Sequence, residues 1–306
     1  MRHKSILTKF VAITICTVLI AVLSGCFASN RITLATLDMP EAVLAGEIMA
    51  QQLESFGFEV VRGQTYRSLA ELEAGMRAGE FDLSAVFLQD ALTDFAAIGE
   101  SPVFDQTLAV EIVNNTIRDV YGYMLLDWWG IEANYTLAVR ERLMQEGFGV
   151  GALAMFAQDM TLAATQDFFE SPGGMAHLNF LFGGLEFREV LVVEQDSFFE
   201  PGRLDADIIA LRTTLTGDWL VNEGFSAIGR GFSEPHTFEG ISIWPSNHLV
   251  PVASEDVMER LPEIQAILSS VSFQIDPATF ANHLREISQG IQTPELAAYE
   301  ILQQRR

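Results

Sequence analysis

The chain has 306 residues, 49% of them hydrophobic, and its 41 acidic and 18 basic residues give a formal net charge of −23 at pH 7. A chain of this length can bury one large core or two smaller ones. The negative charge argues against a nucleic-acid partner, because phosphate binding needs clustered cations.

The N-terminal residues have the pattern of an export signal that ends in a lipidation site. The basic residues Arg2, Lys4 and Lys9 are followed by an apolar run from Phe10 to Leu23, which is too short to span a bilayer. The next residues complete the sequence "LSGC", which resembles the lipobox of bacterial lipoproteins, where the cysteine carries lipid. We therefore expect a lipoprotein signal peptide over residues 1–26 with lipid on Cys26, and an ordinary cleaved signal is the alternative.

Removal of this signal would leave a chain with few reactive side chains. Cys26 would be the sole cysteine, occupied by lipid, so no disulfide, thiolate metal site or cysteine nucleophile is expected within one molecule. Both lysines would be lost, which excludes a P-loop lysine and a Schiff base. The four remaining histidines are isolated and lack metal-ligand spacing: His177, His236, His248 and His283. We expect no metal, no cofactor and no catalytic residues.

The mature chain opens with alternating strand and helix signals. Residues 32–35 predict a strand, and Pro40 suits the first turn of a helix that Gly57 ends. After a second strand, Ser68 and Glu71 have the spacing of a capping box, which predicts a helix that ends at Gly79. Residues 81–87 predict a third strand. Such alternation indicates a parallel sheet covered by helices, an α/β fold.

The C-terminal part predicts two more helices. Asp276 is placed to cap a helix with Pro277 in its first turn, and Gly290 ends it. The pair Thr293-Pro294 starts the last helix. Because the first of these has an apolar face, we expect it to pack on a domain.

Five ordered stretches of the chain resemble the substrate-binding proteins of ABC importers for glycine betaine, choline and related quaternary amines. They are "LDMPEAVLAG", "AGMRAGEFDLSAVF", "NYTLAVRERL", "DMTLAATQDFFESPGGMAHLNFLFGG" and "NHLVPVASEDVMERLPEI". The resemblance implies a type II periplasmic-binding-protein fold, in which two α/β lobes joined by a two-strand hinge close on a ligand. By that analogy, residues 31–130 and 240–306 form lobe one and residues 131–239 form lobe two.

The resemblance also implies an aromatic cage for the ligand. It places cage rings at positions that match Phe87 and Tyr135, the latter in the hinge region. A quaternary ammonium has no N–H donor, so it is recognised by aromatic faces, each worth about 0.5–2 kcal/mol. Asp38 and Met39 after the first strand, and Trp244 at the end of "ISIW", are expected beside Phe87 at the carboxyl ends of strands.

Further candidates for ligand contact have a structural alternative. Trp128 and Trp129 in "DWWG", and Phe198 in "DSFFEPG", are as readily explained as core residues. Asp90 stands where the resembled family has a hydroxyl. If Asp38 and Asp90 both line the cleft, a net cation such as choline fits better than zwitterionic betaine, whose carboxylate would need an arginine or helix N–H donors.

The sequence thus predicts an extracytoplasmic, membrane-tethered solute-binding protein that captures a quaternary amine of the choline or glycine betaine type. The resemblance implies an ABC permease and ATPase as partners. The alternative is an interaction or sensory lipoprotein that keeps the fold but binds no quaternary amine. An enzyme is not expected, because "GFSAIG" lacks the spacing of a nucleophile elbow and no catalytic set is evident.

Overall fold

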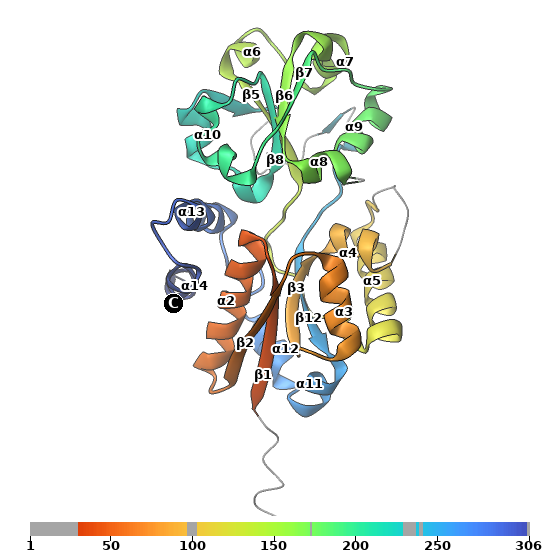
Figure 1. Cartoon of the computed structure of the whole chain (residues 1–306), viewed down its shortest axis with the longest axis vertical. Coiled ribbons are helices and arrows are strands. Elements are labelled where there is room, and N and C mark those ends of the chain that lie inside the picture. Colours follow the sequence, from red (N-terminus) through yellow and green to blue (C-terminus); the bar gives the residue numbers. More distant parts are fainter. Residues whose placement is uncertain (1–29, 97–102, 172, 229–236, 239–240, 305–306) are drawn as a thin grey trace, which may run out of the picture.

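The computed structural model describes residues 30–96, 103–171, 173–228, 237–238 and 241–304, which form two α/β lobes one above the other (Figure 1). The expected signal peptide, Cys26 and His236 lie outside the described residues. Within the described ranges, no helix is both long enough and apolar enough to cross a membrane.

Lobe one is built on a five-stranded sheet of order β2-β1-β3-β12-β4. Its strands are β1 (Arg31–Leu37), β2 (Glu59–Tyr66), β3 (Leu83–Phe87), β4 (Tyr123–Leu125) and β12 (Leu249–Ser254). Its helices are α2 (Pro40–Ser55), α3 (Leu69–Ala78), α4 (Leu88–Asp94), α5 (Gln106–Tyr121), α11 (Glu255–Arg260), α12 (Glu263–Ser269), α13 (Pro277–Ser288) and α14 (Pro294–Gln304). Helix α2 packs on one face of the sheet with the C-terminal helices, and α3, α4 and α5 pack on the other.

The expected helix boundaries in this lobe are confirmed by their caps. The Ser68 hydroxyl accepts a hydrogen bond from the Glu71 N–H at 3.2 Å, and Gly79 ends α3 in the left-handed conformation. The Glu71 carboxylate accepts from the N–H of Arg67, one residue before the expected partner. Asp276 caps α13 by accepting from the Thr279 N–H.

The expected parallel arrangement is confirmed for the first three strands, and the sheet also contains an antiparallel strand. Strands β2, β1 and β3 are parallel, but β12 runs antiparallel to β3 and to β4. The reason is the direction from which the chain returns. Because β12 begins directly after the second crossing from lobe two, it runs away from the cleft, whereas β3 runs toward it.

Lobe two repeats this arrangement in a sheet of order β7-β6-β8-β5-β9. Its strands are β5 (Tyr135–Arg140), β6 (Thr161–Ala164), β7 (Glu189–Val192), β8 (Ile208–Arg212) and β9 (Phe225–Ala227). Its helical segments are α6 (Glu141–Gln145), η1 (Val150–Ala152), α7 (Leu153–Phe156), η2 (Ala157–Asp159), α8 (Gln166–Glu170), α9 (Met175–Phe182), η3 (Gln195–Phe199), η4 (Pro201–Arg203), η5 (Thr213–Leu215) and α10 (Asp218–Asn222). Here β5, which follows the first crossing, is the antiparallel strand between β8 and β9.

Two extended segments connect the lobes and are hydrogen-bonded to each other. The N–H of Ala133 donates to the Asn247 carbonyl at 2.9 Å, and the N–H of Leu249 donates to the Ile131 carbonyl at the same distance. The Asn247 N–H also donates to Oδ1 of Asn134 at 2.7 Å. These bonds join the two crossings into one hinge.

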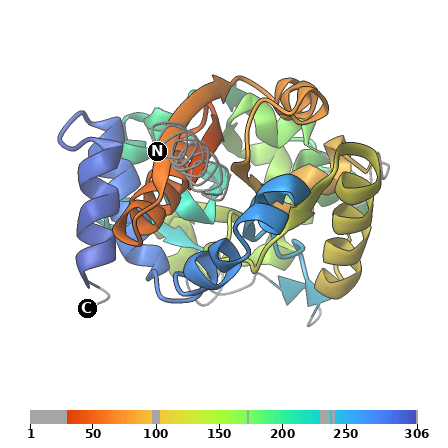
Figure 2. The same ribbon diagram turned by 90° about the horizontal axis from the view of Figure 1, so that it is seen from below.

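Helix α13 contacts both lobes. It packs beside α2 and α14, as seen from below in Figure 2, and Phe280 and Leu284 are buried in the lobe-one core. Its Ala281 is buried in a lobe-two core with Trp219. The guanidinium of Arg285 lies 5.4 Å from the centre of the Trp219 ring. The C-terminal part therefore holds lobe two as well as lobe one.

Candidate ligand-binding cleft

A cleft of about 630 Å³ lies between the lobes, within the size range of small-molecule sites. Its lobe-one wall includes the residues that come directly after β1 and part of α4. Its lobe-two wall includes part of α8 and the end of β8. Its charged lining consists of six acidic residues and two arginines: Asp38, Asp90, Asp94, Asp167, Glu170, Glu194, Arg67 and Arg212. The cleft therefore has an excess of negative charge.

Three acidic side chains reach this region from the first turns of helices that follow parallel strands. Glu41 lies in α2 after β1, Asp90 in α4 after β3, and Asp167 in α8 after β6. An acid is favourable in a first helical turn because the helix dipole is positive there. Since parallel strands end at the cleft, the fold brings the three carboxylates together from distant parts of the sequence.

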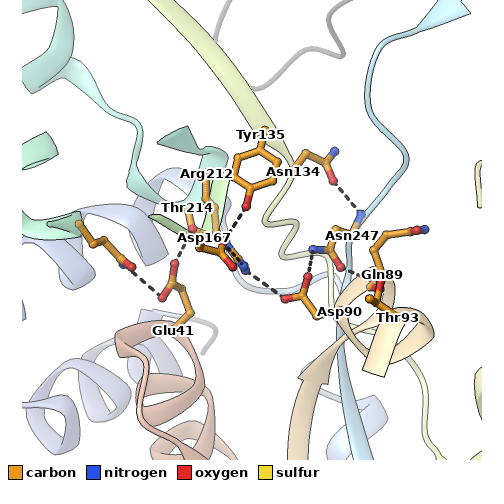
Figure 3. Close-up of polar contacts among 11 residues, drawn as sticks. Glu41, Gln89, Asp90, Thr93, Asn134, Tyr135, Asp167, Arg212, Thr214 and Asn247 are labelled. Carbon is orange, nitrogen blue, oxygen red and sulfur yellow. Dashed lines mark hydrogen bonds and ion pairs between the residues drawn. The ribbon is translucent and has the colours of Figure 1, made fainter. Parts of the chain in front are cut away.

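The side chain of Arg212 lies among these acids and joins the two lobes (Figure 3). Arg212 is the last residue of β8, and its side chain is only 12% exposed. Its Nη1 lies 3.3 Å from Oδ2 of Asp90 in lobe one, and its Nη2 lies 2.9 Å from Oδ2 of Asp167 in lobe two. One cation thus pairs with a carboxylate on each side of the cleft.

Two aromatic rings complete the surroundings of this guanidinium. Its Cζ lies 5.6 Å from the centre of the Phe87 ring and 5.9 Å from that of Tyr135. Both distances are within the range of cation–π attraction. The Tyr135 hydroxyl donates a hydrogen bond to Oδ2 of Asp167 at 2.6 Å, which fixes the ring. The site therefore combines carboxylates with rings, and in this structure they hold Arg212.

The pKa shifts of these groups follow from burial and from their mutual charges. Burial raises the pKa of Asp90, and the charge of Arg212 only partly offsets this. Burial also opposes ionisation of Asp167, but Arg212 and the hydrogen bond from Tyr135 lower its pKa overall. Burial opposes the charge of Arg212 too, yet the neighbouring acids hold its pKa well above the usual value. Burial raises the pKa of Tyr135, so its hydroxyl stays neutral and remains a donor.

A second polar contact joins the lobes beside Arg212. The Glu41 side chain is fully buried, and its Oε1 accepts a hydrogen bond from the Thr214 hydroxyl at 2.8 Å (Figure 3). Its Oε2 accepts a longer bond, 3.4 Å, from Nε2 of Gln195. A buried carboxylate in lobe one is thus satisfied by donors from lobe two, which favours contact between the lobes.

The hinge supplies a further partner for Asp90. Nδ2 of Asn247 donates to Oδ1 of Asp90 at 3.3 Å, while Oδ1 of Asn247 accepts from the N–H of Gln89 at 2.8 Å. Beside them is a small pocket of about 40 Å³, lined in part by Tyr135 and Trp244. Asp90 lines both this pocket and the larger cleft, so its carboxylate connects the hinge to the cleft.

The residues expected to contact a ligand fall into three groups. Asp38, Met39, Asp90 and Phe198 line the larger cleft, although Phe198 is fully buried in a lobe-two core. Tyr135 and Trp244 line only the smaller pocket. The third group lines neither of these two pockets; its members are Phe87, Trp128 and Trp129.

The residues that surround Phe87, Trp128, Trp129 and Trp244 explain why these rings do not line the larger cleft. Phe87 is 2% exposed, with Arg212 over its ring, and Trp129 is 1% exposed in the lobe-one core. Trp128 stacks on His248, with 5.9 Å between ring centres. The expected strand before Trp244 does not belong to the lobe-one sheet: β11 (Ile241–Ser242) pairs with β10 (Thr237–Phe238), and Trp244 packs in a lobe-two core.

Sequence reasoning missed the residues that organise this site. Arg212, Asp167 and Thr214 were not predicted as site residues, and Glu41 lay only within a stretch that carries the resemblance. A usable signal was present, since Arg212 directly follows the apolar strand "IIAL" and so falls at the carboxyl end of a strand. Among the residues that the structure describes, no three His, Cys, Asp or Glu side chains are grouped as metal ligands.

Comparison with known proteins gives the family. Residues 30–183 match the family described as the substrate-binding domain of the ABC-type glycine betaine transport system. The chain belongs to this family. It is a family of transport proteins that bind a substrate, not a family of enzymes. No curated protein sequence matches the chain with significance.

Solved structures of related proteins share the two-lobed fold. A glycine betaine/carnitine/choline ABC transporter protein is 14% identical, with a TM-score of 0.71 over 89% of this chain and 98% of its own. Apo YehZ from Escherichia coli is 17% identical, with a TM-score of 0.67 over 90% and 98%. Lactococcal OpuAC, closed on glycine betaine, is 12% identical, with a TM-score of 0.55 over 90% and 95%. At these identities the likeness establishes the fold.

Proposed function

We propose that this protein captures a quaternary-ammonium solute of the choline or glycine betaine type and delivers it to an ABC importer. The observation that carries the proposal is the acidic cleft between the lobes, beside which carboxylates and the rings of Phe87 and Tyr135 surround the guanidinium of Arg212. A quaternary ammonium needs this chemistry, since it offers positive charge and methyl groups but no hydrogen-bond donor. Family membership supplies the transport role.

The charge of the cleft favours a net cation over a zwitterion. Both Asp38 and Asp90 line it, as the choline hypothesis requires, and acidic residues outnumber arginines there by six to two. Such a field attracts a cation before contact. We therefore propose choline-like solutes as the first candidates and glycine betaine as the second.

One observation favours the alternative, a protein of this fold that binds no quaternary amine. The rings and carboxylates that would hold an ammonium already hold Arg212. An interaction or sensory role therefore stays a second candidate, and the binding experiment separates the two.

The test is thermal denaturation with choline, glycine betaine and carnitine, with 3,3-dimethyl-1-butanol as the control. This alcohol is the uncharged carbon isostere of choline, so it matches the shape and removes the charge. A ligand at one hundred times its dissociation constant adds about 2.7 kcal/mol to the unfolding free energy. We expect a quaternary amine to raise the melting temperature and the isostere to leave it unchanged. No response to any of the three amines would refute the proposed cargo.

We also propose that the protein is anchored outside the cytoplasm through lipid on Cys26, close to permease and ATPase subunits. A tether would raise the effective concentration of loaded protein near the permease. The test is membrane fractionation of Cys26→Ser against the wild type. We expect the variant in the soluble extract, and a variant that stays with membranes would refute lipid attachment at this residue.

A further inference from the structure

The position of Arg212 has a consequence for selectivity. The guanidinium is planar, permanently charged and weakly hydrated, so it satisfies aromatic faces and carboxylates much as an organic ammonium does. Here it is placed between Asp90 and Asp167 and within cation–π distance of Phe87 and Tyr135. These are the groups that the proposed function requires for the ammonium.

We propose that Arg212 is a resident cation that fills the ammonium position, so that a quaternary amine binds only by displacing it from the two rings. This inference rests on the proposed function and identifies Arg212 as the residue that sets the selectivity of the site. Two positive groups cannot share the space between these rings without like-charge repulsion. The affinity for a cation is therefore lowered by the free energy needed to move Arg212.

The surroundings of Arg212 offer a route for this movement. Asp90 is the inner partner, with a side chain 25% exposed, whereas the side chain of Asp167 is 56% exposed on the lobe-two wall. The pair with Asp167 lies within lobe two, because Arg212 ends β8 and Asp167 begins α8. Arg212 can thus leave Asp90 and the rings while it keeps Asp167. Its departure would free one carboxylate of lobe one for the incoming cation.

The experiment measures choline and glycine betaine binding by calorimetry for the wild type, Arg212→Met and Arg140→Met. Methionine keeps an unbranched apolar chain and removes the charge. Arg140 is a matched control in the same lobe: its guanidinium lies 4.2 Å from the centre of the Phe225 ring, and it lines neither pocket described above. We expect Arg212→Met to bind choline at least tenfold more tightly than the wild type, and Arg140→Met to bind it within threefold of the wild type.

Three outcomes overturn the inference in distinguishable ways. If Arg212→Met binds choline no more tightly than the wild type, Arg212 does not compete with the ammonium, although the proposed function stands. If the variant loses betaine with choline unchanged, Arg212 holds a ligand carboxylate instead. If no form of the protein binds either amine, the proposed function fails and the inference with it. Arg212→Gln, which keeps an N–H donor for the acids, is the second variant should methionine prevent folding, and the same tenfold gain is expected.

Discussion

The buried hydrogen bond between Thr214 and Glu41 gives a quantitative test of how the lobes are held together. Thr214→Val keeps the side-chain shape and removes the hydroxyl that donates to Glu41 at 2.8 Å. Glu41 is 0% exposed, and among the described residues the other donor to its carboxylate is Nε2 of Gln195, 3.4 Å away. A hydrogen bond to a charged group is worth about 1.5–3 kcal/mol, so we expect the unfolding free energy to fall by about 2 kcal/mol.

Urea denaturation measures this loss, and small-angle scattering measures whether the lobes separate. If the lobes open in Thr214→Val, water hydrates Glu41 and the loss of unfolding free energy becomes smaller. A loss below about 1.5 kcal/mol should therefore be accompanied by a larger radius of gyration. The control is Thr93→Val, at an exposed cleft residue whose hydroxyl donates to the Gln89 carbonyl of its own helix. We expect this control to change stability by less than about 0.5 kcal/mol.

A double-mutant cycle with Glu41→Gln isolates the contact from the rest of the helix. Residues that share one hydrogen bond show a coupling energy of about 0.5–3 kcal/mol. The reasoning is refuted if Thr214→Val leaves both the stability and the radius of gyration at wild-type values. A cycle in which the two substitutions are additive would refute it equally.

Three other predictions concern lobe one and the tyrosines. A Cβ at Gly75 would lie 2.6 Å from Cζ of Tyr66, so Gly75→Ala should cost about 1–3 kcal/mol by overpacking in urea denaturation. Ser68→Ala removes the cap of α3 and should cost about 0.5–2 kcal/mol in the same assay. Burial raises the pKa of Tyr123 and Tyr135 above the usual range and that of Tyr66 to about 12. These side chains stay protonated in the folded state, whereas tyrosines in the unfolded chain ionise near pH 10. The unfolding free energy should therefore fall as pH rises from about 10 to about 12. In a pH titration of the folded protein, the absorbance of tyrosinate from these residues should appear at a higher pH than that of an unperturbed tyrosine.

The two stability predictions each have a matched control. A Cβ at Gly149 would meet nothing within 4 Å beyond its chain neighbours, and its φ of −140° suits any residue, so Gly149→Ala should leave stability unchanged. The exposed Ser55 bonds to a carbonyl of its own helix, so Ser55→Ala should cost less than Ser68→Ala. Equal costs within either pair would contradict the packing and capping arguments. Tyrosinate absorbance that is complete near pH 10 would contradict the pH prediction.

The sequence by itself determined the local elements of this protein and the family to which it belongs. The cap at Ser68 and the stop at Gly79 depend on partners three or four residues away, so their spacing is legible in the chain. The two-lobed fold was likewise predicted from ordered stretches along the sequence. The composition also revealed the excess of acid that the cleft shows.

Only the tertiary structure decided which side chains meet in the cleft. Arg212 pairs with Asp90, 122 residues away, and with Asp167, 45 residues away, and no local pattern encodes either distance. The ring of Phe87 was predicted correctly as a strand end, but whether it meets solvent or a guanidinium depends on how two lobes approach each other. Contacts between lobes are fixed by packing over long separations, whereas caps and turns are fixed by neighbours, and this is why the helices were predictable and the site was not.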